Sequence, residues 1–190
     1  MDAVVRSRLV SAMDVAHALA SELDLDTGCL PPEALWFVKT ATGSRVAIWR
    51  SPQVWAIRLR EEYGQRPRRF RLPMPGLVFV CSVARQAPSV FAARARPRPA
   101  DDQLFHCPAF NVFRDGRVCP GTHVFPQDPA RIPEEFFKSH FSLTGDSRGR
   151  SQRHPEDLLA LWAEIAGQPT YPVDDLVPAL RLGEALRVGA

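Results

Sequence analysis

Residues 105–125 read FHCPAFNVFRDGRVCPGTHVF. This stretch has neither the two-residue alternation of a strand nor the repeat of a helix, although it is rich in aromatic side chains. The pair Asp115-Gly116 predicts a turn, and Pro120-Gly121 follows directly after Cys119. An irregular segment that is this apolar is typical of a loop held rigidly on a core, where functional sites tend to lie.

Short β-forming runs precede this segment. Residues 34–40 and 45–50 flank the turn ATGS and predict a hairpin, and residues 53–59 can add a further strand. The nearly continuous apolar run 77–83 is typical of a buried strand, and residues 90–95 can pair with it. We therefore expect an antiparallel meander of about four strands.

The flanking regions of the chain are more varied. Nearer the start of the chain, residues 3–10 predict a short strand and residues 13–23 an amphipathic helix, while the proline- and arginine-rich run 66–75 should be extended. Residues 97–102 predict a loop.

The last third predicts helices. One begins at Pro133 and runs through His140, one begins at Pro155 and ends before Gly167, and a third is expected over residues 174–187. The polar residues 142–153 predict a mobile loop. We therefore expect an α+β fold, with residues 1–190 forming a single domain.

Length and composition limit the function classes. The 190 residues are 45% hydrophobic and 24% charged, which suits one compact domain with its own core. No apolar run reaches membrane-spanning length, and the start lacks the pattern of a secretory signal. We expect a cytoplasmic protein with no membrane partner.

The positive charge is carried almost entirely by arginine. Net charge is +3, and the two lysines are Lys39 and Lys138. Arginines gather in residues 58–71 and 94–98, where prolines and apolar residues interrupt them. No nucleic-acid motif is present, so a solvated surface is the preferred interpretation. Docking of an acidic partner or of nucleic acid stays open.

Four cysteines are too few for a disulfide scaffold in a chain of this length, and none forms a C-x-x-C pair. Cys81 lies in an apolar run, so we expect it to be a core residue. We expect Cys29 to have a structural role, and the role of Cys107 is open. A metal site also stays open, and its candidate ligands are His106, Cys107, Cys119 and His123. Because His106 and Cys107 are adjacent, their side chains would point apart in an extended chain, which makes joint binding of one metal ion awkward.

The spacing around Cys119 resembles ubiquitin-conjugating enzymes. Their motif H-P-N-[VI]-x-x-x-G-x-[IV]-C matches here at Asn111, Gly116 and Cys119 and at the two apolar residues between them. The run 104–121, LFHCPAFNVFRDGRVCPG, is similar to prokaryotic ubiquitin-conjugating-like family D, which includes the B proteins of PRTRC systems. The flanking LPMPGLVF and IPEEFFKSHF also resemble that family, so the likeness covers residues 72–141.

This resemblance implies a bacterial modifier transferase. Cys119 would accept a ubiquitin-like modifier as a thioester from a ThiF-like activating enzyme, and Asn111 would donate to the carbonyl oxygen during transfer. Asp115 and Gly116 would shape the turn that brings Asn111 back to Cys119. Pro120 and Gly121 would keep the following segment out of a helix or strand, so that the sulfur stays accessible. No cofactor or metal is implied.

This sequence also departs from the motif. Ala109 and Phe110 replace its histidine and proline, although His106 could replace some of the histidine's bonding. The acidic residue that would act on an attacking amine is not identified by the pattern, and the candidates are Asp115, Asp128 and Asp146.

Two other functions stay open. One is a non-catalytic module that binds a modifier or partner. The other is a cysteine hydrolase that pairs Cys119 with His123, His140 or His154.

Overall fold

The computed structural model describes residues 11–12, 30–40, 43–61, 65–82, 87–98, 100–143 and 145–187. The chain divides into two compact units, Met1–Leu30 and Pro31–Ala190. The strand expected at 3–10, the helix expected at 13–23 and Cys29 all lie outside the described residues. The single domain expected over residues 1–190 stays a prediction.

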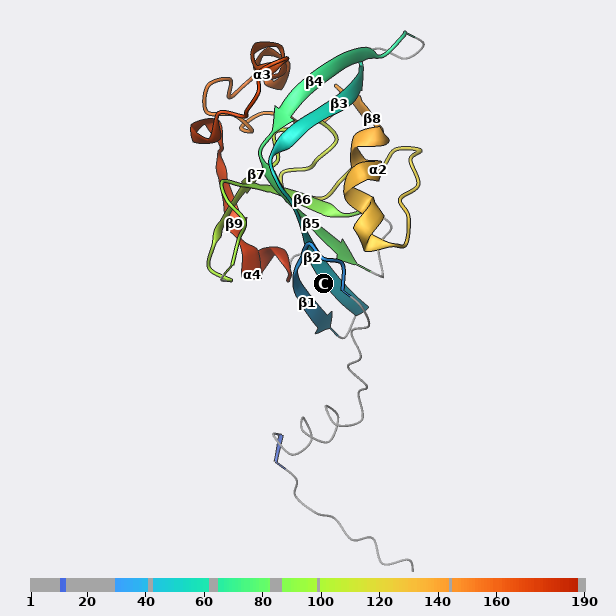
Figure 1. The fold of residues 1–190 in the computed structure, drawn as a ribbon, viewed down its shortest axis with the longest axis vertical. Helices are drawn as coiled ribbons and strands as arrows, with labels where there is room; N and C mark the ends of the chain where they lie inside the picture. Colours follow the sequence, from blue (N-terminus) through green and yellow to red (C-terminus); the bar gives the residue numbers. More distant parts are fainter. Residues whose placement is uncertain are drawn as a thin grey trace, which may run out of the picture. The chain divides into compact units, whose positions relative to one another are not determined.

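A six-stranded sheet runs through the second unit (Figure 1). Each pair of neighbouring strands in this sheet is antiparallel. Central β5 has six consecutive buried residues, as the apolar run there predicted. In order across the sheet, the strands are β1 (Ala34–Thr40), β2 (Gly43–Arg50), β5 (Gly76–Ser82), β6 (Ser89–Ala93), β7 (Gln103–His106) and β9 (Pro178–Arg181).

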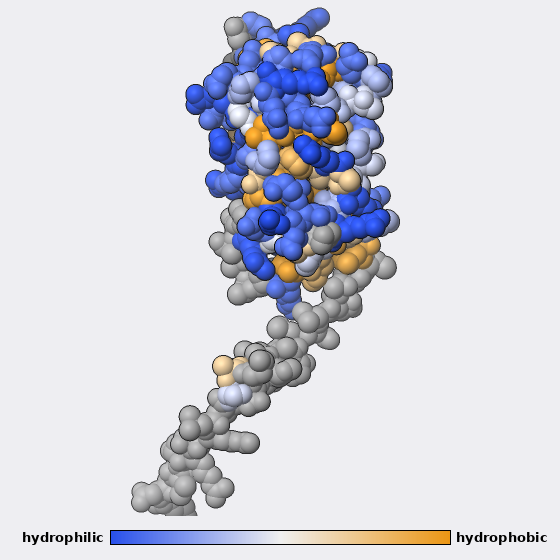
Figure 2. Space-filling model, turned by 90° about the vertical axis from the view of Figure 1, so that its left-hand side faces the viewer, coloured by the Kyte–Doolittle hydropathy of each residue, from blue (hydrophilic) through white to orange (hydrophobic). Residues whose placement is uncertain are grey.

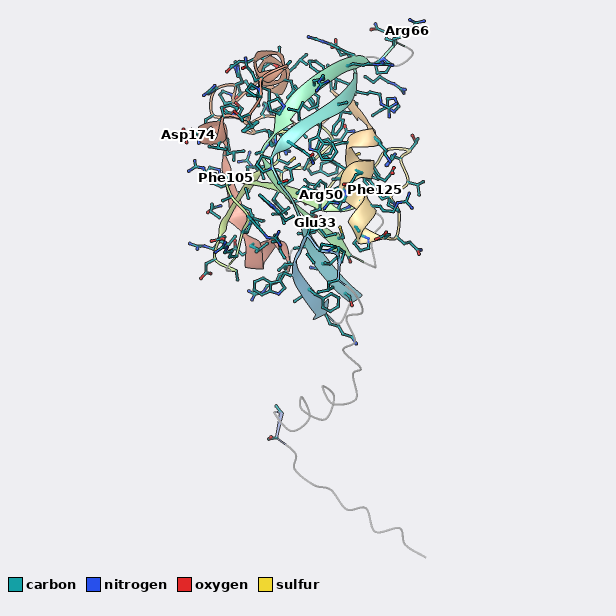
Figure 3. All side chains as sticks on the ribbon, viewed as in Figure 1. Glu33, Arg50, Arg66, Phe105, Phe125 and Asp174 are labelled. Atoms are coloured by element: carbon teal, nitrogen blue, oxygen red, sulfur yellow. The ribbon has the colours of Figure 1, made fainter. Side chains whose placement is uncertain are left out.

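A smaller sheet of three strands has the order β4 (Arg68–Met74), β3 (Gln53–Arg60), β8 (His140–Ser142). Strands β3 and β4 form an antiparallel hairpin, in which burial alternates along part of each strand and the last three residues of β4 are all buried. Strand β8 pairs parallel to β3. Figure 3 labels Arg66 at the tip of this hairpin.

The helices are short and carry clear end signals. Helix α2 (Ile132–Lys138) follows the 3₁₀ turn Pro129–Arg131 and has Glu134 and Glu135 in its first turn, where carboxylates suit the helix dipole. Helix α3 (Leu158–Ile165) is capped by the Asp157 carboxylate, which accepts from two backbone amides. Gly167 follows its end at φ 79°, as a helix stop signal predicts.

The main core lies between the two sheets and helices α2 and α3. Trp162 of α3 is fully buried there, with Phe110 and Phe141 against its ring. A second cluster covers the opposite face of the six-stranded sheet, where Leu182, Ala185 and Leu186 close over it. Seen from the side of α3 and β9, hydrophilic residues dominate the surface, with apolar residues between them (Figure 2).

Ion pairs fix the start of β1 to helix α2. Arg50 on β2 pairs with Glu33 at 3.4 Å and with Glu134 at 3.0 Å. Figure 3 shows Arg50 and Glu33 side by side near the middle of the unit.

The structure confirms the α+β class and corrects several elements. The hairpin of residues 34–50 and the strands at 53–59, 77–83 and 90–95 are confirmed within a residue or two. The count of about four strands was wrong, because the described residues form nine strands in two sheets.

The helix expected over residues 174–187 was also wrong. Pro178 lacks the amide that a helix interior needs, and residues 178–181 instead form edge strand β9 against β7. A 3₁₀ turn (Val173–Asp175) precedes β9, and the short helix α4 (Leu182–Ala185) follows it. No helix among the described residues is long and apolar enough to cross a membrane.

Candidate functional site

Asn111 and Cys119 form the two ends of a small hairpin. The backbone amide of Cys119 donates to the carbonyl oxygen of Asn111 at 2.7 Å. Val112 and Val118 form a bridge one step further in, and the Phe113 amide donates to the Arg117 carbonyl at 2.7 Å. The separation of eight residues between Asn111 and Cys119 is therefore the length of one closed hairpin.

Gly116 lies at the turn of this hairpin, against β6. Its φ of 87° is a conformation that residues with a side chain seldom adopt. A Cβ at this position would lie 2.3 Å from the Phe91 ring, so the turn packs directly on the sheet. The Val90 amide donates to the Gly116 carbonyl at 2.7 Å, and the Val118 amide to that of Pro88 at 3.0 Å. These bonds fix the hairpin to β6.

The carboxylate of Asp115 closes the same turn. It accepts from the Arg117 amide at 3.1 Å and from the Arg117 Nε at 2.6 Å. Asp115 therefore bonds within the hairpin.

The side chain of Asn111 is bonded to strand β8. Its Oδ1 accepts from the amide of Ser142 at 3.1 Å and from the Ser142 hydroxyl at 2.9 Å, and its Nδ2 donates to the His140 carbonyl at 2.9 Å. Asn111 also has a φ of 58°, which asparagine tolerates better than most residues. The amide group is thus held in one orientation by a second element.

Cys119 is exposed, whereas Cys81 and Cys107 are buried. Burial raises the pKa of Cys81 and the pKa of Cys107 to about 12, because a thiolate is poorly solvated there. Among the described cysteines, Cys119 is therefore the one that solvent and a partner can reach. Its neighbours Pro120 and Gly121 form a turn in which the His123 amide donates to the Pro120 carbonyl.

A pocket of about 200 Å³ connects the hairpin to the loop that follows β8. Its lining residues are Phe110, Asn111, Val112, Phe113, Cys119, Gly145, Asp146 and Ser147. The Arg148 guanidinium and amide donate to Asp146 and hold the pKa of its carboxyl below the usual range. Asp128 instead accepts from the Ala130 amide at the start of the 3₁₀ turn. Of the three carboxylates considered from the sequence, Asp146 is the one on the pocket.

Arg150 is a part of the site that the sequence did not reveal. It lies in the segment expected to be a mobile loop, yet it is 2% exposed. Its guanidinium donates to the carbonyl oxygens of Cys107 and Val112, so it ties residues 107–112 to this segment from inside. One arginine among many carries no pattern that marks it as buried. The loop expectation is corrected here, because Ser142 belongs to β8 and Arg150 and Ser151 are buried.

The histidines lie elsewhere. His154 bonds to Glu164 on α3 at 2.6 Å, and the ring of His123 packs edge-on against Phe125. Burial lowers the pKa of His106 to about 4, so this ring is neutral at physiological pH. Across the described part of the chain, no histidine nitrogen bonds to the Cys119 sulfur, and no three His, Cys, Asp or Glu side chains are arranged to hold a metal ion.

Comparison with known proteins adds one match. Residues 9–179 match the model of a protein family described as prokaryotic E2 family D. No curated protein and no solved structure gives a significant match.

Proposed function

The chain belongs to prokaryotic E2 family D, and from this premise we propose that it receives a ubiquitin-like modifier as a thioester on Cys119 and passes it on. The observation that carries this proposal is the exposure of Cys119 at the end of the 111–119 hairpin, while Cys81 and Cys107 are buried. Two mostly antiparallel sheets with few helices are compatible with a ubiquitin-conjugating-like fold.

The proposed reaction has two exchanges at the modifier's carbonyl carbon. The Cys119 thiolate first attacks the thioester on a ThiF-like activating enzyme; a new C–S bond forms, and the enzyme's sulfur leaves with the electron pair of the broken bond. An acceptor amine or hydroxyl then attacks the same carbon and loses its proton, and Cys119 leaves as a thiolate. Nucleotide chemistry belongs to the activating partner, so the proposal assigns no cofactor to this chain.

In this proposal Asn111 stabilises the negative charge that each attack builds on the carbonyl oxygen. A primary amide carries two hydrogens on nitrogen, and the bond to the His140 carbonyl uses one of them. The bonds to β8 hold the other hydrogen in a fixed direction, which is the property an oxyanion donor needs. Asn111 also lines the same pocket as Cys119.

Asp146 is the carboxylate that we propose acts on the acceptor. It lines the Cys119 pocket, whereas Asp115 and Asp128 are not among the residues that line it. Because Arg148 lowers its pKa, Asp146 is ionised at neutral pH and is a weak base. Its role would therefore be to orient an attacking amine. Replacing Asp146 with Asn should slow discharge to a free amine and leave charging unchanged, with Asp174→Asn as the matched control.

The two alternatives have less support. A non-catalytic binding module would be favoured by a buried Cys119, and this residue is exposed. A cysteine hydrolase would be favoured by a histidine bonded to the sulfur, and among the described residues His123, His140 and His154 form no such bond.

The decisive experiment is a charging assay. The protein is mixed with its activating enzyme, the modifier and ATP, and the adduct is tested with reductant. We expect a reductant-sensitive adduct that is lost in Cys119→Ala, becomes reductant-resistant in Cys119→Ser and is unchanged in the matched Cys29→Ser control. Absence of any adduct with active partners would exclude the transferase and leave the binding module.

A further inference from the structure

The outward face of the three-stranded sheet carries a row of cations. Arg58 on β3 lies directly opposite Arg69 on β4 and, on its other side, opposite His140 on β8. Because side chains alternate along a strand, these three residues point to the same face of the sheet. Arg60 and Arg71, two positions further along β3 and β4, share that face. We call these four arginines and His140 the cationic face; burial and the charges of Arg58 and Arg60 lower the pKa of His140, so its ring is neutral at physiological pH and the arginines carry the charge.

These charges are not balanced within the described part of the chain. Like charges directly opposite each other on neighbouring strands are destabilising. Arg69 and Arg71 are exposed and form no ion pair with a described residue, and the buried Nε of Arg60 has no hydrogen-bond partner there. Arg58 donates to the backbone carbonyl of Lys138, which is uncharged. The face therefore has cations to offer to an anionic partner.

A groove of about 480 Å³ adjoins this face, between the β3–β4 hairpin and α2. Arg58, Arg69 and Arg71 line it together with Lys138. Ala56, Ile57, Phe70 and Phe137 supply its apolar part. A ligand that fits this groove has several carboxylates and small or apolar groups between them.

The surface chemistry favours a polypeptide over a nucleic acid. Proteins that bind single strands stack the bases on exposed aromatic rings. Phe70 and Phe137 are buried, and the Trp55 ring is stacked on Phe137 at a centroid distance of 4.1 Å. Val54 is an exposed large apolar residue of this hairpin, and it offers no ring for stacking.

We propose that the cationic face and its groove dock an acidic, extended segment of a partner protein. Docking there places the partner beside the candidate site, because β8 contributes His140 to the cationic face and bonds to the Asn111 side chain through the His140 carbonyl and Ser142. The docking itself does not depend on thioester chemistry. It can therefore be tested separately from the transfer activity.

The test uses a short, fluorescein-labelled peptide of alternating glutamate and leucine, titrated with the full chain and followed by fluorescence anisotropy. Replacing both Arg69 and Arg71 with Ser should weaken binding roughly tenfold, since each exposed ion pair contributes a modest amount. The matched control, Arg96→Ser with Arg187→Ser, removes the same charge elsewhere and should bind as the unmodified chain does. Added salt should weaken binding, because the contacts are exposed.

A second variant guards against loss of folding. Ala56→Glu places a carboxylate opposite Arg71 within the groove and should also weaken binding, while circular dichroism stays unchanged. The proposal is overturned if the unmodified chain does not bind the peptide or if the cationic-face and control variants bind it equally. It is also overturned if a single-stranded oligonucleotide of similar charge binds more tightly than the peptide and loses this affinity when Arg69 and Arg71 are replaced.

Discussion

The Asn111 side chain bonds to strand β8, and we propose that it also acts in transfer; experiments can separate its effect on stability from its effect on transfer. Asn111→Asp keeps the shape and an acceptor for Ser142 but removes the hydrogens on nitrogen. We expect it to slow discharge of the thioester about 10²–10³-fold, the usual effect of losing an oxyanion donor. Ser142→Ala removes one bond to Asn111 and keeps the donor, so it should cost about 1 kcal/mol of stability and change discharge little. Single-turnover discharge measures the effect of each variant on transfer, and urea unfolding measures its effect on stability. Equal slowing in the two variants would mean that Asn111 acts by holding the hairpin alone.

Gly116 and Gly121 are a natural pair for measuring the cost of a side chain in the hairpin region. Both have positive φ, 87° and 55°, but a Cβ on Gly116 would meet the Phe91 ring and one on Gly121 would meet nothing within 4 Å. Gly121→Ala should therefore lower the free energy of unfolding by about 1 kcal/mol from backbone strain alone. Gly116→Ala adds overpacking and should cost about 2–4 kcal/mol in total. Chemical unfolding checks this difference; similar losses would show that the turn can move away from β6.

At the scale of elements, strand positions followed from the sequence where burial alternates or runs continuously, as in β3 and β5. The way in which the strands pair with one another could not be predicted from the sequence. The parallel pairing of Arg58 with His140 joins residues that are 82 apart, and nothing local in either segment specifies it. The helix expected over residues 174–187 was wrong for the same reason, because β9 is a strand only through its pairing with the distant β7. Asn111, Gly116 and Cys119 became candidates because their spacing resembles a family motif, and that spacing corresponds to one local hairpin. The burial of Arg150 depends instead on distant carbonyl groups, which no local pattern encodes.

The contacts of Arg150 predict how the segment after β8 supports the hairpin. Its bonds to the Cys107 and Val112 carbonyls join two elements through one buried cation. Arg150→Met fills similar space but leaves both oxygens without that donor, which should cost about 1–3 kcal/mol for each that stays buried. Hydrogen exchange should then be faster at the Cys119 amide, which bonds to Asn111 next to Val112. The matched control Arg148→Met removes an exposed arginine two residues away and should leave that amide's exchange unchanged.

At the scale of the whole molecule, buried titratable groups determine how stability varies with pH. Burial lowers the pKa of His106 from 6.5 to about 4, so the unfolded chain binds a proton there that the folded chain does not. Stability should therefore fall as pH decreases from about 6.5 to about 4. Burial raises the pKa of Cys81 and of Cys107 from 9.0 to about 12, so the folded chain retains protons that the unfolded chain loses. Stability should consequently also fall as pH rises above about 9. Urea unfolding across this range, repeated with His106→Gln, tests the acidic limb: the variant should lose less stability between pH 6.5 and 4, and an unchanged slope would assign that limb to other groups.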